Sequence, residues 1–479
     1  MTIYFDFQST FKYNTNHSIM KKITKLCIGT LAFVFLFYNQ DIGLNATLIA
    51  LLIWILLYQK PIKSGNKKEF WLLSACVFLS SVSFAWYGDV FSFFAMFISV
   101  TVLGFQSQYP KINIVLYPFL WFLNYATFIF KFFSFKYWLP KRIAGDTFFK
   151  KLLALVVIPS FFVITFMIIY ASGSDTFYSF FQNITFNFNF IQIVFLSCLG
   201  FFLFFNVWFV FIPKVFIKIN NQLGMNFSIG KQINLTPTFS FLEIDFERRS
   251  GEISLILLNI LLVFFIITYN YEQFFSTATT ATLSDEIHQR VVTIIFSIIM
   301  AIGVIMFYFK SSFNFDKKAG LLKKLSYIWI ILNALLIMSA FIKNAEYVSA
   351  LGLTFKRIGV FIFLTLSLVG LFVTYLKLHY LKTNIFLLNR MLRIFFVTVI
   401  ITSCINFSWI VTKYNIAFHK NDDTEYLKNL NFNKQVLYNN YRNDPSWQSY
   451  FDNQKEIIKW QKSKGILSWH LYFESLKIN

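Results

Sequence analysis

Long apolar runs separated by short polar stretches make up most of this chain. A helix that crosses a bilayer needs about 20 mostly apolar residues, because lipid offers no partners to unpaired backbone groups. Twelve segments approach or exceed this length: 23–38, 43–58, 70–86, 88–106, 112–133, 152–171, 187–213, 252–270, 289–309, 323–343, 356–379 and 391–411. The pattern therefore predicts an all-α fold, a polytopic transmembrane helical bundle of about eleven or twelve spans.

The basic clusters between these segments favour eleven spans. Cytoplasmic loops carry an excess of Lys and Arg, and this marks the residues before 23 and the loop 59–69 as internal. The basic loop 134–151 is also internal only if one earlier segment does not cross. We predict that 112–133 is the segment that does not cross the membrane. Pro118 should break its helix, and its aromatic residues suit the membrane interface. This predicts an internal N-terminus and an external C-terminal tail.

Two polar stretches between the spans carry patterns of their own. Residues 174–186, "SDTFYSFFQNITF", place apolar side chains at helical spacing, which predicts an amphipathic helix lying flat on the outer surface. In 242–247, apolar residues alternate with Glu and Asp. This alternation indicates either a short strand or a solvated acidic edge.

Composition shifts divide the chain into three regions. Residues 1–22 form an N-terminal cytoplasmic segment, 23–412 the transmembrane domain, and 413–479 a polar tail of amphipathic helices with Pro445 at a first helical position. The run after Met20 resembles a signal peptide without a cleavage site, so we expect an uncleaved span, and translation starting at Met20 is an alternative. A tail this short rarely holds a core alone, so it should dock on the membrane domain or on a partner.

Charge and composition narrow the partners. The chain is 57% hydrophobic and has a formal net charge of +21, but its basic residues cluster in loops beside apolar runs. This favours membrane lipids as partners, with other envelope proteins reached through the tail, and argues against nucleic acid. Four cysteines lie inside apolar runs without paired spacing and indicate small buried hydrophobes: Cys27, Cys76, Cys198 and Cys404.

Candidate chemistry is sparse. The middles of the spans hold amides rather than Asp, Glu, His or Arg, and such amides usually join helices by hydrogen bonds; they are Asn124, Gln192, Asn206, Asn259, Asn333 and Asn406. The chain contains no Walker loop, no G-x-G-x-x-G and no H-E-x-x-H motif. We therefore expect no cofactor and no catalytic residues, and take the chain as a non-enzyme by default.

The stretch 283–291, "LSDEIHQRV", concentrates charge in front of an apolar run. It is typical of a helix start, with Ser284 as the N-cap and with Asp285 and Glu286 complementing the helix dipole. A second interpretation is a binding rim on the outer face. Asp285 and His288 stand at the i, i+3 spacing at which two side chains share a metal, and the preceding span ends near Glu272. The rim would comprise Glu272, Asp285, Glu286 and His288, and the sequence does not identify a metal.

Several strings resemble a bacterial multi-pass family known as domain of unknown function 4173, with a related family, 4153. The strings are "RRSGEISLILLNILLVFF", "LSDEIHQRVVTIIFSIIMAI" and "YVSALGLTFKRIGVFIFLTLSLVGLFVTYLK", with "FYNQDIGLN" near the start and "KYNIAFHKNDDTEYLKNL" after the last span. The resemblance implies an integral protein of the bacterial inner membrane, and it supplies no site residues. It draws attention to "LTFKRIG", where Lys356 and Arg357 either bind lipid headgroups or snorkel to the interface.

The sequence is compatible with two functions. The first is a non-catalytic envelope protein that organises or senses through its outer loops and tail. The alternative is a transporter or a membrane-embedded transferase acting on a lipid-linked substrate. A transporter requires a polar cavity at mid-membrane and a transferase a groove lined by carboxylates, whereas a scaffold requires neither. Substrate, oligomeric state and the choice between Met1 and Met20 lie beyond the sequence.

Overall fold

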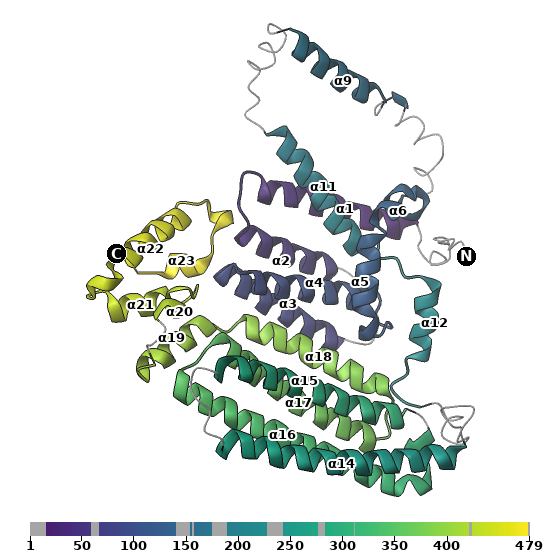
Figure 1. Cartoon of the computed structure of the whole chain (residues 1–479). Helices are drawn as coiled ribbons and strands as arrows, with labels where there is room; N and C mark the ends of the chain where they lie inside the picture. Colours follow the sequence, from purple (N-terminus) through teal and green to yellow (C-terminus); the bar gives the residue numbers. More distant parts are fainter. Residues whose placement is uncertain are drawn as a thin grey trace. The chain divides into compact units, whose positions relative to one another are not determined.

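A computed structural model describes residues 16–58, 67–139, 154–155, 158–174, 189–227, 243–275, 283–310, 312–420 and 424–477. In these ranges the regular structure is helical and no strand occurs (Figure 1). One isolated bridge pairs Asn226 with Lys382. The predicted all-α fold is therefore confirmed.

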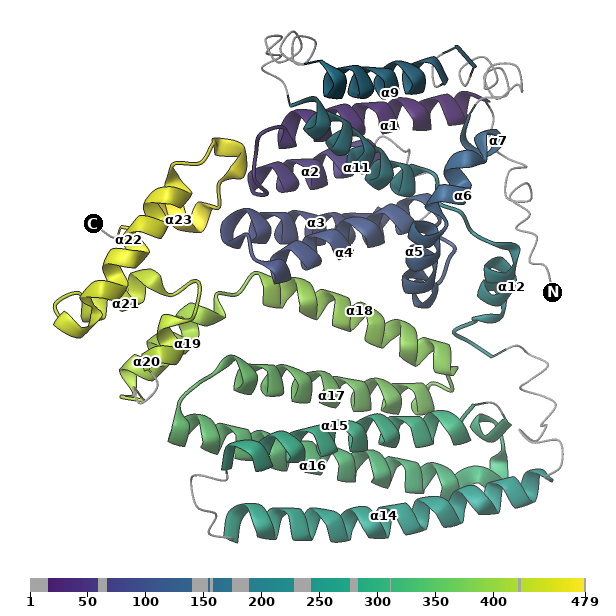
Figure 2. The same cartoon turned by 45° about the horizontal axis from the view of Figure 1, so that its top comes forward.

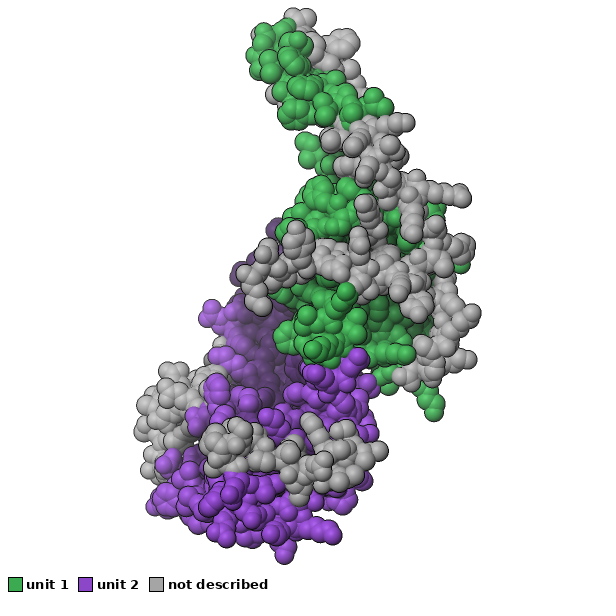
Figure 3. Space-filling view, turned by 90° about the vertical axis from the view of Figure 1, so that its right-hand side faces the viewer, with its two compact units in different colours: residues 1–112, 116–219, 459–474 green, residues 113–115, 220–458, 475–479 purple. Residues whose placement is uncertain are grey.

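The chain divides into two compact units, coloured separately in Figure 3. Unit 1 contains residues 1–112, 116–219 and 459–474, and unit 2 contains residues 113–115, 220–458 and 475–479. The C-terminal region thus contributes first to unit 2, then to unit 1, and ends in unit 2. The sequence boundaries at 22/23 and 412/413 stay predictions.

Unit 1 is built around apolar helices that pack along one another. Helix α1 lies along α11, α3 lies along α4, and α2 contacts α1, α3 and α4 (Figure 2). The elements are α1 (Asn16–Phe37), α2 (Leu44–Tyr58), α3 (Lys67–Tyr87), α4 (Val90–Gln108), α5 (Tyr117–Ala126), α6 (Phe128–Phe133), α7 (Phe135–Trp138), α9 (Ile158–Gly173) and α11 (Phe190–Trp208). Helix α12 (Lys214–Gln222) follows and leads into unit 2.

Unit 2 has its core between long helices. Helix α16 packs against α14, α15 and α17, and α17 packs against α18. The elements are α14 (Ile244–Phe275), α15 (Leu283–Tyr308), η3 (Ser312–Asn314), η4 (Lys317–Ala319), α16 (Gly320–Leu351), α17 (Phe355–His379), α18 (Asn384–Ser403) and α19 (Phe407–Ala417). Trp329, Leu336 and Ile337 of α16 lie buried in this core.

The length and apolar composition of the described helices indicate a multi-pass membrane protein. By length and composition, seven are apolar enough to cross a membrane: Lys68–Tyr87, Val90–Gln108, Phe190–Trp208, Ile244–Glu272, Lys317–Leu351, Phe355–His379 and Asn384–Ser403. Shorter apolar helices cover Leu44–Tyr58, Ile114–Ala126, Ile158–Met167 and Thr293–Tyr308. The count of eleven spans and their orientation stay predictions.

The segment 112–133 is not one helix, but the reason differs from the predicted one. A 3₁₀ turn, η1 (Ile114–Leu116), leads into α5, where Pro118 occupies the first turn. Proline is tolerated there because the first helical N–H groups need no partner within the helix. The break falls instead at Thr127, between α5 and α6.

The predicted span 391–411 is wrong in its bounds. The apolar helix α18 begins at Asn384 and ends at Ser403, and a separate helix, α19, begins at Phe407. The new helix begins after Asn406, because the Asn406 side chain accepts a hydrogen bond from the backbone N–H of Trp409 and so caps α19. Hydropathy alone did not reveal this cap.

The strand considered for 242–247 is also wrong, because α14 begins at Ile244. Asp245 and Glu247 lie in its first turn, where negative charge complements the helix dipole. Of the four cysteines predicted to be buried, only Cys76 is, whereas Cys27, Cys198 and Cys404 are exposed. The predicted amphipathic helix at 174–186 lies, apart from Ser174, outside the described residues.

Short helices form the C-terminal tail and pack on the larger helices. They are α20 (Thr424–Lys428), α21 (Lys434–Tyr441), η5 (Pro445–Trp447), α22 (Gln448–Lys462), η6 (Ile466–Ser468) and α23 (Leu471–Ser475). In unit 2, Leu427, Leu437 and Trp447 share one apolar cluster with Val348 and Val411. The tail up to residue 458 therefore buries its apolar face against the end of α16 and against α19.

Candidate functional site

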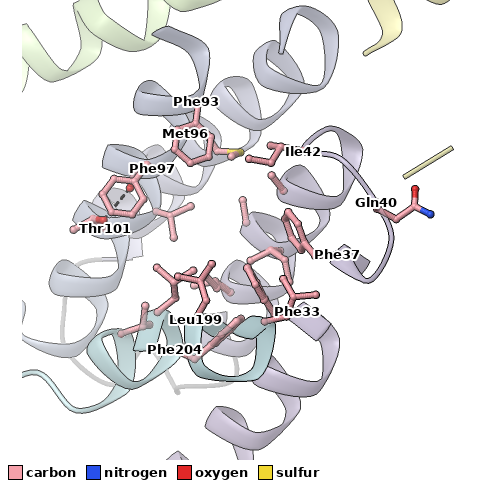
Figure 4. A pocket seen from close by; sticks show the side chains of 18 of the residues that line it. Phe33, Phe37, Gln40, Ile42, Phe93, Met96, Phe97, Thr101, Leu199 and Phe204 are labelled. Atoms are coloured by element: carbon pink, nitrogen blue, oxygen red, sulfur yellow. Dashed lines mark hydrogen bonds between the residues drawn. The ribbon is translucent and has the colours of Figure 1, made fainter. Parts of the chain in front are cut away.

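An apolar pocket of about 540 Å³ lies within unit 1, among α1, α2, α4, α5 and α11 (Figure 4). Alanine and isoleucine residues of α2 line it together with aromatic residues of the other helices. The lining side chains are Phe33, Phe37, Gln40, Ile42, Ala46, Ile49, Ala50, Ile53, Phe93, Met96, Phe97, Val100, Thr101, Tyr125, Gln192, Phe195, Leu196, Leu199, Leu203, Phe204 and Val207. The volume falls within the range of about 300–1,000 Å³ that is typical of small-molecule sites.

The pocket has few polar groups, and none of its lining residues is charged. The Thr101 hydroxyl donates to the carbonyl of Phe97 in its own helix at 2.8 Å, so its donor is already used (Figure 4). Gln40 and Gln192 are placed near the turn that joins α1 to α2: Gln40 follows α1, and α11 starts beside this turn, where the Asn189 N–H donates to the Tyr38 hydroxyl at 2.9 Å. The pocket therefore has an apolar body with Gln192 towards one end, whereas the amide of Gln40 points away from the cavity (Figure 4).

The C-terminal segment of unit 1 lies at this end of the pocket. Ser468 Oγ donates to Gln40 Oε1 at 2.9 Å and accepts a hydrogen bond from the Asp41 N–H at the same distance. Asp41 also pairs with Lys464, with 3.0 Å between Oδ2 and Nζ. Sequence reasoning missed these contacts, because more than 400 residues separate their partners along the chain. It also missed the pocket, because five separate helices contribute to the lining.

A buried lysine that the sequence did not predict lies elsewhere in unit 1. Lys131 of α6 is fully buried, and its Nζ donates to Oδ1 of Asn124 at 3.0 Å and to Oδ1 of Asn206 at 2.8 Å. The sequence predicted that these asparagines join helices, and both do so by accepting from the Lys131 Nζ. A single Lys in the aromatic run "FIFKFF" is the only signal for this arrangement that the sequence offers.

Unit 2 contains a buried ion pair between the start of α14 and the turn that precedes α16. Arg248 of α14 donates to Asp316 Oδ2 through Nη1 at 2.9 Å and to Asp245 Oδ1 through Nη2 at 2.5 Å. Asp316 is buried and also caps η4 by accepting from the Lys318 N–H at 2.8 Å. These contacts fix the start of α14 against the turn that precedes α16, which is a structural role.

The structure describes only part of the predicted binding rim. Glu272 is exposed near the end of α14, and residues 285, 286 and 288 lie in the first turns of α15. The side chains of Asp285, Glu286 and His288 lie outside the described part of the chain, so the rim stays a prediction. Helix α15 starts at Leu283, one residue before the predicted Ser284 cap, and helix ends are defined to within one or two residues. Where the structure is described, no three His, Cys, Asp or Glu side chains group as a metal site requires.

The two basic residues that open α17 differ in their surroundings. The Arg357 guanidinium donates to the carbonyls of Leu351 and Gly352, which stabilises the C-terminal end of α16. Lys356 is exposed. Lipid headgroup binding at this pair stays a prediction, with Lys356 as the more accessible cation.

Comparison with known proteins gives one family. A family model described as "Domain of unknown function (DUF4153)" matches residues 26–439. This is the second of the two families that the sequence resembled, and the relation to family 4173 stays a prediction. No curated protein and no solved structure matches the chain.

Proposed function

The chain belongs to this family of unknown function, and from that premise we propose that it is a non-catalytic membrane protein that binds a lipid chain in the unit 1 pocket. Binding would serve an organising or sensing role in the cell envelope. The observation that carries the proposal is the lining of the pocket, which is almost wholly apolar and uncharged. Such a lining favours hydrocarbon, because burying an unpaired polar group costs free energy and burying apolar surface releases it.

The placement of Gln192 supports an amphiphilic ligand rather than a plain hydrocarbon. Gln192 provides a hydrogen-bonding group near the α1–α2 turn, while Phe33, Phe204 and Leu199 line the apolar body. A ligand with one polar end and one hydrocarbon chain would match this distribution. Membrane lipids and lipid-linked carriers share this chemistry, and both surround a multi-pass protein.

The alternative functions find less support in the same pocket. A transporter needs a polar cavity, and a transferase needs carboxylates or another acid–base group near the reacting atoms. The lining residues supply neither. We also propose, from the loop charges and the family resemblance, that the protein lies in a bacterial inner membrane with its N-terminus inside and its tail outside.

Filling the pocket tests the proposal. Ala50 is 4% exposed and lines the pocket from α2, so Ala50→Trp should occupy the space of a lipid chain. Val82 of α3, which is 46% exposed and does not line the pocket, gives the matched control Val82→Trp. Each protein would be purified in mild detergent, and its retained lipids would be counted by native mass spectrometry.

We expect the parent protein and Val82→Trp to retain the same lipid species and Ala50→Trp to lose at least one of them. All three should keep a cooperative thermal transition, which shows that the fold survives. Equal retention in all three proteins, or a parent protein that retains no lipid, would contradict the proposal.

A further inference from the structure

The C-terminal segment of unit 1 is fixed tightly to the turn between α1 and α2. The Lys464–Asp41 ion pair and both hydrogen bonds of Ser468 join it to this turn. Ser468 is 3% exposed, and a Cβ on Gly43 would lie 2.5 Å from its backbone carbonyl carbon. Only glycine at position 43 therefore permits this close approach.

The same segment also contacts the turn between α3 and α4. The His470 ring packs edge-on against Phe84, with 6.0 Å between ring centroids. Gly88 adopts a positive φ of 66°, and a Cβ there would lie 2.0 Å from His470 Nδ1. Because α3 and α4 are long apolar helices that can cross the membrane, the turn at Gly88 lies where the chain leaves the apolar layer. The contacts with His470 place the C-terminal segment at this same level.

Two large apolar side chains of this segment are left uncovered. Trp460 is 58% exposed and Ile466 is 65% exposed, although they belong to a polar region of the chain. The Lys464 Nζ lies 3.8 Å from the centroid of the Trp460 ring, so the ion pair with Asp41 also holds the tryptophan. Lys459 and Lys462 occupy the last turn of α22 beside it, and both belong to the solvent-facing side of this helix.

We propose that residues 459–466 form a membrane-surface contact that inserts Trp460 and Ile466 among lipid headgroups, with Lys459 and Lys462 facing anionic lipid. Tryptophan prefers the membrane interface because it joins an apolar body to a polar N–H, and lysine beside it gains from anionic headgroups. The level fixed by Gly88 and His470 brings these side chains to that interface. This contact is independent of lipid binding in the pocket.

The full-length protein in lipid nanodiscs allows a direct test. An environment-sensitive fluorophore would be attached to Ile466→Cys in a background whose four native cysteines are replaced by alanine. The control carries the label at Ser446→Cys, an exposed tail position outside the segment. Headgroup-level nitroxide lipids would quench the fluorophores in zwitterionic discs and in discs that also contain anionic lipid.

We expect quenching at position 466 to exceed that at position 446, and Lys459→Gln with Lys462→Gln to remove any gain from anionic lipid. Quenching at 466 no stronger than at 446 would overturn the proposal. So would concentration-dependent cross-linking of two copies of the Ile466→Cys variant without lipid quenching, because the surface would then be a protein interface. If labelling disturbs the fold, Trp460→Phe provides a second measurement. It should reduce the quenching of intrinsic fluorescence by brominated lipids, and an unchanged signal would count against the contact.

Discussion

Asn124 pairs with both backbone polar groups of Phe211. Its Nδ2 donates to the Phe211 carbonyl at 2.9 Å, and its Oδ1 accepts from the Phe211 N–H at 2.7 Å. The segment that follows α11 thereby gains the partners that a helix would otherwise provide. Asn415 does the same for Leu353 in unit 2, with distances of 3.0 Å and 2.7 Å. A buried asparagine thus stabilises the chain after a long helix in each unit.

Asn124→Leu should destabilise the protein severely. The change keeps the volume but removes partners from both polar groups of Phe211 and from Lys131. A buried polar group without a partner costs about 1–3 kcal/mol, so we expect a loss of about 3 kcal/mol or more. Thermal unfolding in detergent would measure it, with the exposed Asn440→Ala as the control. A melting temperature equal to that of the control would contradict the structural role of Asn124.

The two carboxylates around Arg248 should differ in importance. Asp316 is buried and also caps η4, whereas the Asp245 side chain is 54% exposed. Removing the buried partner leaves the guanidinium with only the exposed Asp245, so Asp316→Ala should cost about 3 kcal/mol. Asp245→Ala should lower the melting temperature much less, because solvent screens the exposed pair. The opposite order in a thermal scan would show that the contact with Asp316 is not the stabilising one.

Lys434 should make the stability of the tail depend on pH. It is 9% exposed, its Nζ donates to the Tyr450 hydroxyl at 2.8 Å, and burial lowers its pKa from 10.5 to about 8. Between these values the unfolded state binds more protons than the folded state, so stability rises with pH above about 8. Above pH 10 Tyr450 opposes this rise, because burial raises its pKa from 10.0 to about 12 and the folded state then retains the proton.

Lys434→Met should therefore remove the gain in melting temperature between pH 8 and pH 10. The exposed Lys459→Met is the control and should keep the parent slope. Thermal scans across this pH range measure both variants. A slope that survives in Lys434→Met would assign the pH dependence to another group.

The contacts of residues 464–470 require that the tail and the α1–α2 turn face the same compartment. Ile42 of this turn is 58% exposed, and Ile466 is 65% exposed. In intact cells, cysteines at these positions should react alike with a membrane-impermeant maleimide. The loop charges further predict that both react, whereas a cysteine at Lys318 stays protected. Labelling of positions 42 and 466 from opposite sides would contradict the contacts themselves.

Much of the fold could be predicted because a helix in lipid must satisfy its own backbone. Most of the apolar runs coincide with helices for this reason, including α3, α4, α16 and α17. The errors occurred where one side chain outweighs average hydropathy. Asn406 caps α19 inside a segment that reads as one span, and Arg248 forms ion pairs where alternation suggested a strand. Both effects depend on atoms that a window average does not include.

The sequence by itself determined that the chain is helical and lies in a membrane, because both follow from the length and polarity of local segments. Only the tertiary structure forms the pocket, buries Lys131 and brings Ser468 to Gln40. Each of these joins residues distant along the chain, so no local pattern specifies it. Burying a lysine in an apolar run costs free energy unless its amine has hydrogen-bond partners. Asn124 and Asn206 provide these partners for Lys131, and only the packing of α5, α6 and α11 brings the three side chains together.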